Sequence, residues 1–237
     1  MTQEVRRALR YSALMIGILV GMWGLERVMR PGLDPAAFAE LSQKLASASR
    51  KETRAPGTVD VDRTPTLTRV TKERPRFVNL RTGPGWQLRI MGWTRIDAHV
   101  FSVDAFHHDV VKALSPLDYA LGWQAAATPE AVSRISAMHF TREASFKGMN
   151  AGEARSLTNM HLIPGSVAIF DAMREVVKGD SIALVGYPVK VSSRRLFLPW
   201  TSDMSYGDAN CEIVVVTGIR VESAEERLKQ AVDLRGS

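Results

Sequence analysis

Hydrophobic and polar residues change their spacing several times along this chain of 237 residues. The first feature is a run of 15 uncharged residues, Tyr11 to Leu25, between Arg10 and Glu26. A membrane span usually contains about 17–25 residues, and a cleaved signal peptide is the competing interpretation of such a run. No small-x-small cleavage site follows directly. The pattern therefore favours an uncleaved transmembrane signal anchor over residues 11–29.

Charges beside this run predict its orientation. Three arginines precede it (Arg6, Arg7 and Arg10), and two follow it (Arg27 and Arg30). The positive-inside rule then keeps the N-terminus in the cytoplasm. This predicts a single-pass protein of the bacterial inner membrane whose C-terminal domain is periplasmic.

The next segment has a helical pattern. Asp34 before Pro35 is typical of an N-cap and first helical position, and three apolar residues then recur at helical spacing in "PAAFAELSQKL". A single weak apolar stripe favours a solvated stalk, with a dimerising or membrane-apposed helix as the alternative. Residues 50–76 are rich in Thr, Pro and Arg and lack a long apolar period, which indicates a basic linker.

From about Phe77 the pattern becomes that of a globular domain. Alternation in "WQLRIMGW" and "HVFSVDAF" predicts a hairpin joined by "TRIDA", while "SIALVGYPVKV", "CEIVVVTGIRV" and "RLFLPW" predict further strands. Helices are predicted where Ser or Thr precedes Pro, in "SPLDYALGW" and "TPEAVSRISAMHF". Ser166 is expected to cap the helix of "GSVAIFDAMREVVKGD".

The order of strands, helices and strands predicts an α+β fold. We expect an N-terminal transmembrane helix followed by a bent antiparallel sheet, or a partly open small barrel, with three or four helices. Gly92 and Gly186 lie inside strand patterns, where glycine often marks a bulge or a barrel corner. The predicted division is a cytoplasmic tail, a transmembrane anchor, a stalk helix with linker, a globular α+β domain and a C-terminal helix or tail, at residues 1–10, 11–29, 30–76, 77–222 and 223–237.

Charge argues against nucleic acid as a partner. The formal net charge is +6, but residues 1–80 hold 14 basic and 8 acidic residues, whereas residues 81–237 hold 17 of each. A nucleic-acid-binding domain carries its basic excess on the folded part, where it displaces counterions from phosphates.

Cysteine and glycine usage exclude several kinds of site. Cys211 is the only cysteine, which excludes an intrachain disulfide, a cysteine-based zinc framework and a Cys-x-x-Cys redox motif. The glycines do not have Rossmann or P-loop spacing. We therefore expect no cofactor and no metal.

His161, in "TNMHLIPG", is the first candidate for chemistry. A histidine can act as a general base or metal ligand near neutral pH, but the other histidines lack ligand spacing around it. The alternative is a partly buried ring bonded to backbone at a turn before Pro164. A second cluster, "FHHD" at 106–109, is expected to be a polar loop, because adjacent histidines on a strand point to opposite faces.

Cys211 and His161 would form a nucleophile and base pair, with Asp118 or Asp208 to orient the ring. Against this, Cys211 opens an apolar strand, where cysteine usually behaves as a small hydrophobe. Asp118 could equally cap its own short helix. Trp123 and Trp200, with Asp208, are candidates for a ligand groove; the alternative is that the tryptophans cover the core.

Four motifs carry a resemblance to a known family. "SPLDYALGW", "NMHLIPG", "GDSIALVGYPV" and "CEIVVV", in that order, resemble a family of uncharacterised bacterial membrane-anchored proteins, from about Trp86 to Val221. The resemblance implies no activity. The chain departs from the family pattern before "CE", where members have an Arg and an Asp with several glycines and this chain has "TSDMSYGDAN".

These observations predict a single-pass envelope protein whose periplasmic domain is a binding or assembly module. The alternative is a membrane-tethered hydrolase or transferase that uses His161 and Cys211. Expected partners are the lipid bilayer, through residues 11–29, and an envelope protein, and a homo-oligomer is left open.

Overall fold

The computed structural model describes residues 35–48, 56–70, 76–81, 85–105 and 109–226. Among the described residues, strands make up 45% and helices 22%. The molecule is therefore mostly β, and the predicted α+β class is wrong. The segment "SPLDYALGW" shows the reason, because most of it forms a buried strand and only its first residues resemble a helix start.

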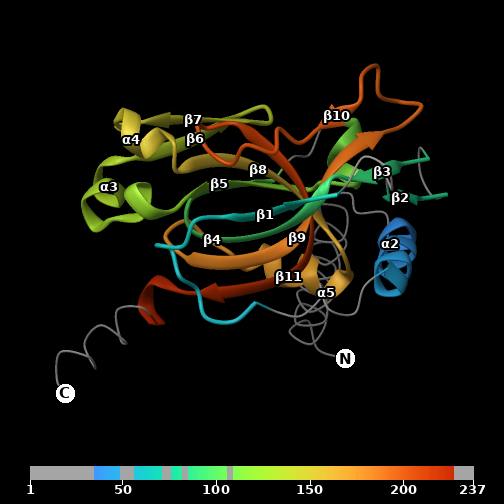
Figure 1. Cartoon of the computed structure of the whole chain (residues 1–237), viewed down its shortest axis with the longest axis horizontal. Coiled ribbons are helices and arrows are strands. Elements are labelled where there is room, and N and C mark those ends of the chain that lie inside the picture. Colours follow the sequence, from blue (N-terminus) through green and yellow to red (C-terminus); the bar gives the residue numbers. More distant parts are fainter. Residues whose placement is uncertain (1–34, 49–55, 71–75, 82–84, 106–108, 227–237) are drawn as a thin grey trace, which may run out of the picture.

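Five strands close on themselves to form a barrel (Figure 1). β4 (Gly92–Ala105) pairs with β5 (Leu117–Gly122), β5 with β8 (Leu157–Pro164), β8 with β11 (Cys211–Glu222), β11 with β9 (Ser181–Ser192), and β9 pairs again with β4. The β8–β11 pair is parallel and the other four are antiparallel. Residues 94–98, "TRIDA", lie inside β4, so the hairpin predicted around them is absent from this part of the chain.

Bulges and one glycine bend the barrel wall. The register shifts between Val100 and Ser102 in β4 and between Val216 and Gly218 in β11. Such bulges increase the local twist and help a sheet to close. At Gly186 of β9, a Cβ atom would lie 2.1 Å from the Val215 carbonyl oxygen, so only glycine allows the two strands to approach this closely.

Alternate residues of the barrel strands form an apolar interior. Tyr119, Met160 and Val214 are buried there, and Phe170 and Met173 of α5 (Val167–Arg174) pack against them. Ser166 caps α5 by accepting a hydrogen bond from the Ile169 N–H, as predicted. These contacts bury one face of the barrel strands and leave the opposite face to other elements.

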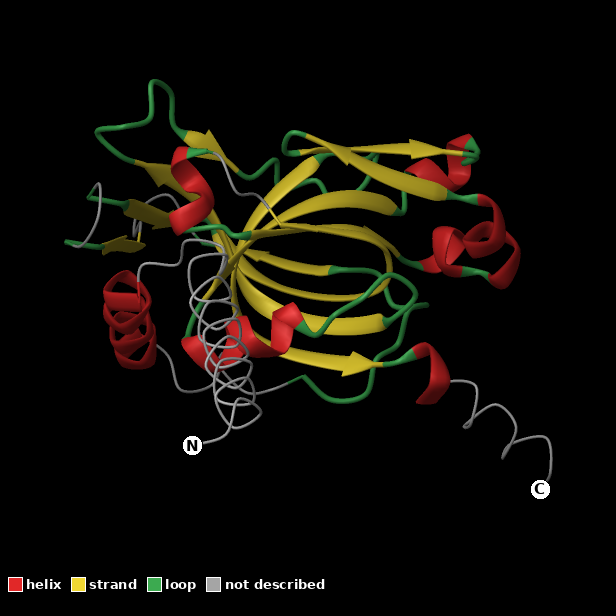
Figure 2. Cartoon of the chain, turned by 180° about the vertical axis from the view of Figure 1, so that it is seen from behind, coloured by secondary structure: helices red, strands yellow, loops and turns green. Residues whose placement is uncertain are grey.

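A two-stranded hairpin covers part of that opposite face. β6 (Ser136–Phe140) and β7 (Glu143–Lys147) contact β4, β5 and β8 and lie along the upper side of the barrel in Figure 1. Short helices lie at one end of the barrel near the hairpin in Figure 2, namely η2 (Gln124–Ala127), α3 (Pro129–Arg134) and α4 (Ala151–Ala154). The further short helix η1 (Val110–Ala113) lies at the opposite end, where Val111 joins the same apolar cluster as Leu88 of β3.

The remaining strands extend the barrel at its other end. β1 (Thr66–Arg69) pairs with β4, β2 (Arg76–Asn79) with β3 (Gln87–Ile90), and β3 and β10 (Trp200–Thr201) with the second half of β9. Predicted strand "RLFLPW" is thus reduced to its last residue and the following Thr201.

Helix α2 (Pro35–Ala48) packs beside these strands. Phe38, Leu41 and Leu45 are 2%, 0% and 3% exposed and join the same apolar cluster as Leu88 of β3. The apolar stripe of this helix therefore faces the chain's own domain and not solvent.

The predicted transmembrane anchor at residues 11–29 lies outside the described residues. Within the part of the chain that the structure describes, no helix has the length and apolar character needed to cross a bilayer. The structure therefore does not support the predicted transmembrane helix and signal anchor, nor the single-pass inner-membrane location with a periplasmic domain, and we correct these predictions. Fifteen uncharged residues are also fewer than the roughly 20 that a helical span needs.

Candidate active site

Three neighbouring strands bring Asp118, His161 and Cys211 to one face of the barrel wall. Asp118 of β5 lies directly opposite His161 of β8. Cys211, the first residue of β11, lies opposite Asn159, which is two residues before His161. Because residues two apart on a strand share a face, the three side chains gather on the face opposite the apolar interior.

The Asp118 and His161 side chains are hydrogen-bonded inside the protein. His161 Nδ1 lies 2.5 Å from Asp118 Oδ2, and the two residues are 2% and 0% exposed. The Cys211 thiol is the other polar neighbour of the imidazole and, like Asp118, raises its pKa. Since Nδ1 is engaged by the carboxylate, Nε2 is the nitrogen left for the thiol. The order thiol, imidazole, carboxylate is that of a nucleophile, its base and the group that orients the base.

The hydrogen bonds change how strongly this pair holds a proton. Burial lowers the pKa of His161, but the hydrogen bonds to Asp118 and to Cys211 outweigh it and raise the pKa above 6.5. Burial also raises the pKa of Asp118, against the opposing effects of His161 and Arg142. The pair therefore keeps its shared proton to a higher pH than an imidazole or a carboxyl group does in water.

Arg142 holds the second oxygen of the Asp118 carboxylate. It lies between β6 and β7, and its Nη1 is 3.3 Å from Asp118 Oδ1. The same guanidinium donates to the Ser115 carbonyl at 2.9 Å and forms an ion pair with Asp109. These contacts fix the carboxylate, so that Oδ2 faces the imidazole.

Trp200 lies against another side of the His161 ring. Its ring centroid is 4.7 Å from that of His161, at an interplanar angle of 49°. The guanidinium carbon of Arg142 is 5.1 Å from the centroid of Trp200, within the range of a cation–π contact. Trp200 thus links the loop between β9 and β10 to the tip of the β6–β7 hairpin, beside the triad.

A second chain of polar side chains reaches Cys211 through Asn159. The Asn159 Nδ2 lies 3.6 Å from Cys211 Sγ and 2.7 Å from the Arg142 carbonyl oxygen. The Asn159 Oδ1 lies 3.2 Å from His139 Nε2, and His139 Nδ1 lies 3.2 Å from Ser102 Oγ. Asn159 is 0% exposed, so this network fixes the amide from several sides.

The segment before Cys211 is held by a buried carboxylate. Glu212 accepts hydrogen bonds from the backbone N–H groups of Met204, Ser205 and Tyr206, and from the hydroxyl of Ser202. Met204, Tyr206, Asp208 and Ala209 have positive φ angles, a conformation that non-glycine residues rarely adopt. Strained backbone of this kind is typical of functional sites that the surroundings hold in place.

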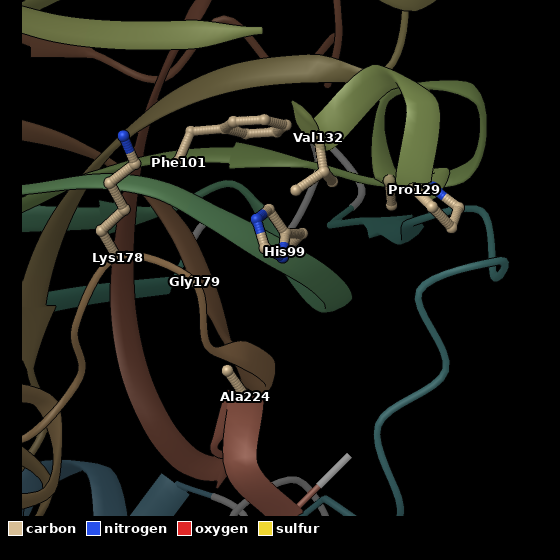
Figure 3. A pocket seen from close by; sticks show the side chains of 8 residues that line it. His99, Phe101, Pro129, Val132, Lys178, Gly179 and Ala224 are labelled. Carbon is tan, nitrogen blue, oxygen red and sulfur yellow. The ribbon is translucent and has the colours of Figure 1, made fainter. Parts of the chain in front are cut away.

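Two hollows open elsewhere on the surface. One, of about 550 Å³, is lined by side chains of β4, α3 and the segment before β9, including His99, Phe101 and Lys178 (Figure 3). The other, of about 650 Å³, is lined by Arg81, Arg194 and other residues near β2 and β3. No triad residue lines either hollow. Among the described residues, no group of His, Cys, Asp and Glu is arranged to hold a metal ion.

The structure brings some of the candidate residues from the sequence together and places the others elsewhere. Asp118, His161, Cys211 and Trp200 come together, whereas Trp123 is buried in the apolar interior. Asp208 is exposed, and its backbone N–H donates to the Ala154 carbonyl, so Asp118 is the carboxylate that contacts His161. His107 and His108 lie outside the described residues, and Asp109 pairs with Arg142.

Three site residues were missed by sequence reasoning. Arg142, Asn159 and His139 reach the triad from the hairpin and from β8, and no motif spacing marks them. The period-two alternation of β8 would place Asn159 beside His161, but only after "TNMHLIP" is identified as a strand.

No family model, curated protein or solved structure matches the chain in the comparisons made. Its chemistry must therefore be argued from its own geometry.

Proposed function

We propose that this protein is a thiol-dependent hydrolase or acyltransferase with Cys211 as its nucleophile. The single observation that carries the proposal is that three adjacent strands bring Asp118, His161 and Cys211 together, with the Asp118 carboxylate bonded to the imidazole and the thiol near enough to raise the imidazole pKa. Cys211 is a partly exposed residue, which an enzyme nucleophile that meets its substrate requires. A cysteine kept only as a small hydrophobe does not require a buried carboxylate and imidazole beside it.

The residues support a two-step reaction on a carbonyl compound. His161 Nε2 accepts the thiol proton while Sγ bonds to the carbonyl carbon, and the carbonyl π electrons move to oxygen. When this adduct collapses, the carbonyl re-forms, the leaving group departs and takes the proton from His161. Water, or an acceptor amine, hydroxyl or thiol, then loses a proton to His161 and attacks the thioester, which restores the Cys211 thiol.

Each neighbour has a role in this scheme. Asp118 keeps the proton on Nδ1 and stabilises the imidazolium, and Arg142 keeps Asp118 in position. Trp200 forms a wall beside the imidazole. The binding or assembly function expected from the sequence stays a prediction, which a pull-down would test.

The test uses the full-length protein with p-nitrophenyl acetate as the acyl donor. We expect Cys211 to be acylated, with release of about one equivalent of p-nitrophenolate before any turnover. Because the chain has one cysteine, mass spectrometry assigns any thioester to Cys211. The Cys211→Ser variant should form no thioester, and His161→Gln should slow acylation by roughly 10²–10⁴-fold.

Iodoacetamide labelling with and without urea provides the control. A native Cys211 that is alkylated only after unfolding would show a buried, inert thiol. That result, or His161→Gln reacting as fast as the wild type, would rule out the proposed nucleophile and base.

A further inference from the structure

The contacts of Asn159 determine which way its side-chain amide points. The Arg142 carbonyl oxygen can only accept a hydrogen bond, so the atom 2.7 Å from it must be the Asn159 nitrogen. The Asn159 Oδ1 therefore faces His139, and His139 Nε2 must carry a proton to donate to it. His139 Nδ1 is then free of a proton in the neutral ring and accepts from the Ser102 hydroxyl.

This arrangement aims an N–H group at the place where charge develops during acyl transfer. The Asn159 Nδ2 carries two hydrogens, of which the Arg142 carbonyl uses one. The same nitrogen is 3.6 Å from Cys211 Sγ, and the oxyanion of an adduct is bonded to the carbon that the sulfur has attacked. A donor at this position is thus within reach of the roughly 2.7–3.1 Å contact that an oxyanion hole requires.

We propose that Asn159 donates a hydrogen bond to the oxyanion formed on Cys211, and that His139 is a positioning residue for the Asn159 amide. The inference rests on the proposed function and assigns a further catalytic group to it. Because Asn159 is already held by two partners, its donor needs no reorganisation when the charge appears.

Two reactions of the same thiol separate this role from a structural one. Acylation by p-nitrophenyl acetate passes through an oxyanion, whereas alkylation by iodoacetamide is a displacement at a saturated carbon and forms none. In full-length protein, Asn159→Ala should slow acylation by about 10²–10³-fold and change alkylation by less than about threefold. An equal fall in both rates would show that Asn159 only maintains the site, and would overturn the inference.

Variants of His139 test the positioning role without removing the donor. His139→Gln retains an N–H that can reach the Asn159 oxygen, and His139→Leu does not. We expect acylation by His139→Leu to be about tenfold slower and by His139→Gln to be close to the wild-type rate, with alkylation unchanged in both. Equal acylation by both variants would overturn the role of His139.

The outcomes also distinguish a failure of this inference from a failure of the proposed function on which it rests. Wild-type protein that is alkylated at Cys211 but never acylated contradicts the proposed function itself, and the inference with it. Wild-type protein that is acylated, with Asn159→Ala acylated equally fast, contradicts the inference alone.

Discussion

The imidazole of His161 is held on three sides, by the Asp118 carboxylate, the Cys211 thiol and the Trp200 ring. A buried histidine without partners would lose its proton more easily than in water. Here the partners outweigh burial, and the charged form is favoured. The ring is therefore part of the structure and of the proposed chemistry at the same time.

This charge balance predicts a pH dependence. Because folding raises the pKa of His161, its contribution to the free energy of unfolding is complete below pH 6.5, the ordinary value. It decreases as the pH rises through the raised native pKa. As the pH rises above 6.5, the wild type should lose more unfolding free energy than His161→Gln in urea titrations.

NMR of the imidazole provides the direct measurement. We expect the His161 pKa to lie above 6.5 in the wild type and to fall in Asp118→Asn, because burial then dominates. A wild-type value below 6.5 would contradict the balance of effects described above.

Part of the site could be predicted from single residues. Asp118, His161 and Cys211 were candidates because a carboxylate, an imidazole and a thiol are the groups that nucleophilic catalysis needs. Their proximity could not be predicted, since it depends on the pairing of three strands that are far apart in sequence. Arg142 could not be found at all, because an arginine in a polar turn looks like a solvated residue.

Among the elements, the segment between β10 and β11 positions the thiol most directly. Glu212 binds three backbone N–H groups of this segment, and Cys211 is its immediate neighbour. Each buried N–H group that is left without an acceptor costs roughly 1–3 kcal/mol of folding free energy. The carboxylate therefore keeps a strained segment in one conformation.

Removing this carboxylate should destabilise the protein. We expect Glu212→Ala to lower the free energy of unfolding by about 3 kcal/mol in urea titrations, because several donors lose their acceptor. Limited proteolysis should then cut faster between residues 202 and 210. The matched control is Glu222→Ala, at the other end of β11, whose partly exposed carboxylate accepts from the Val59 N–H and Arg220. Equal destabilisation by the two changes would contradict this role of Glu212.

Element prediction succeeded where local signals agree with the final packing. Thr128 and Ser166 cap α3 and α5 as expected, and the strands predicted in "SIALVGYPVKV" and "CEIVVVTGIRV" are β9 and β11. It failed for β5 and β8, whose helix-start and turn signals are outweighed by burial between neighbouring strands. A strand buried on both faces lacks the alternation that would have identified it.

At the scale of the whole molecule, closure of the barrel depends on β9, which pairs with β4 along one edge and β11 along the other. Gly186 is the residue at which β9 lies opposite both Thr94 and Val216. Any side chain here would collide with backbone, which cannot move without opening the wall.

Gly186→Ala should therefore weaken the entire fold. We expect a loss of about 3 kcal/mol in the free energy of unfolding, measured by urea denaturation, because the new methyl group overpacks a backbone contact. Gly57→Ala is the control, since a Cβ there meets nothing within 4 Å, and should change stability by less than about 0.5 kcal/mol. A Gly186→Ala protein as stable as the Gly57→Ala protein would show that the backbone of the barrel strands adjusts at this point without a loss of stability.

The parallel pairing of β8 with β11 has a consequence for the order in which the molecule acquires its reactivity. Parallel strands need a long connection, and here residues 165–210, including α5 and β9, separate the two. Contacts of such high sequence separation form slowly, because loop closure precedes them. During synthesis the thiol is among the last parts of the domain to emerge, and it meets its base only when β11 docks. In the unfolded or nascent chain Cys211 therefore has no base beside it, and the proposed nucleophile can form only once β11 has docked.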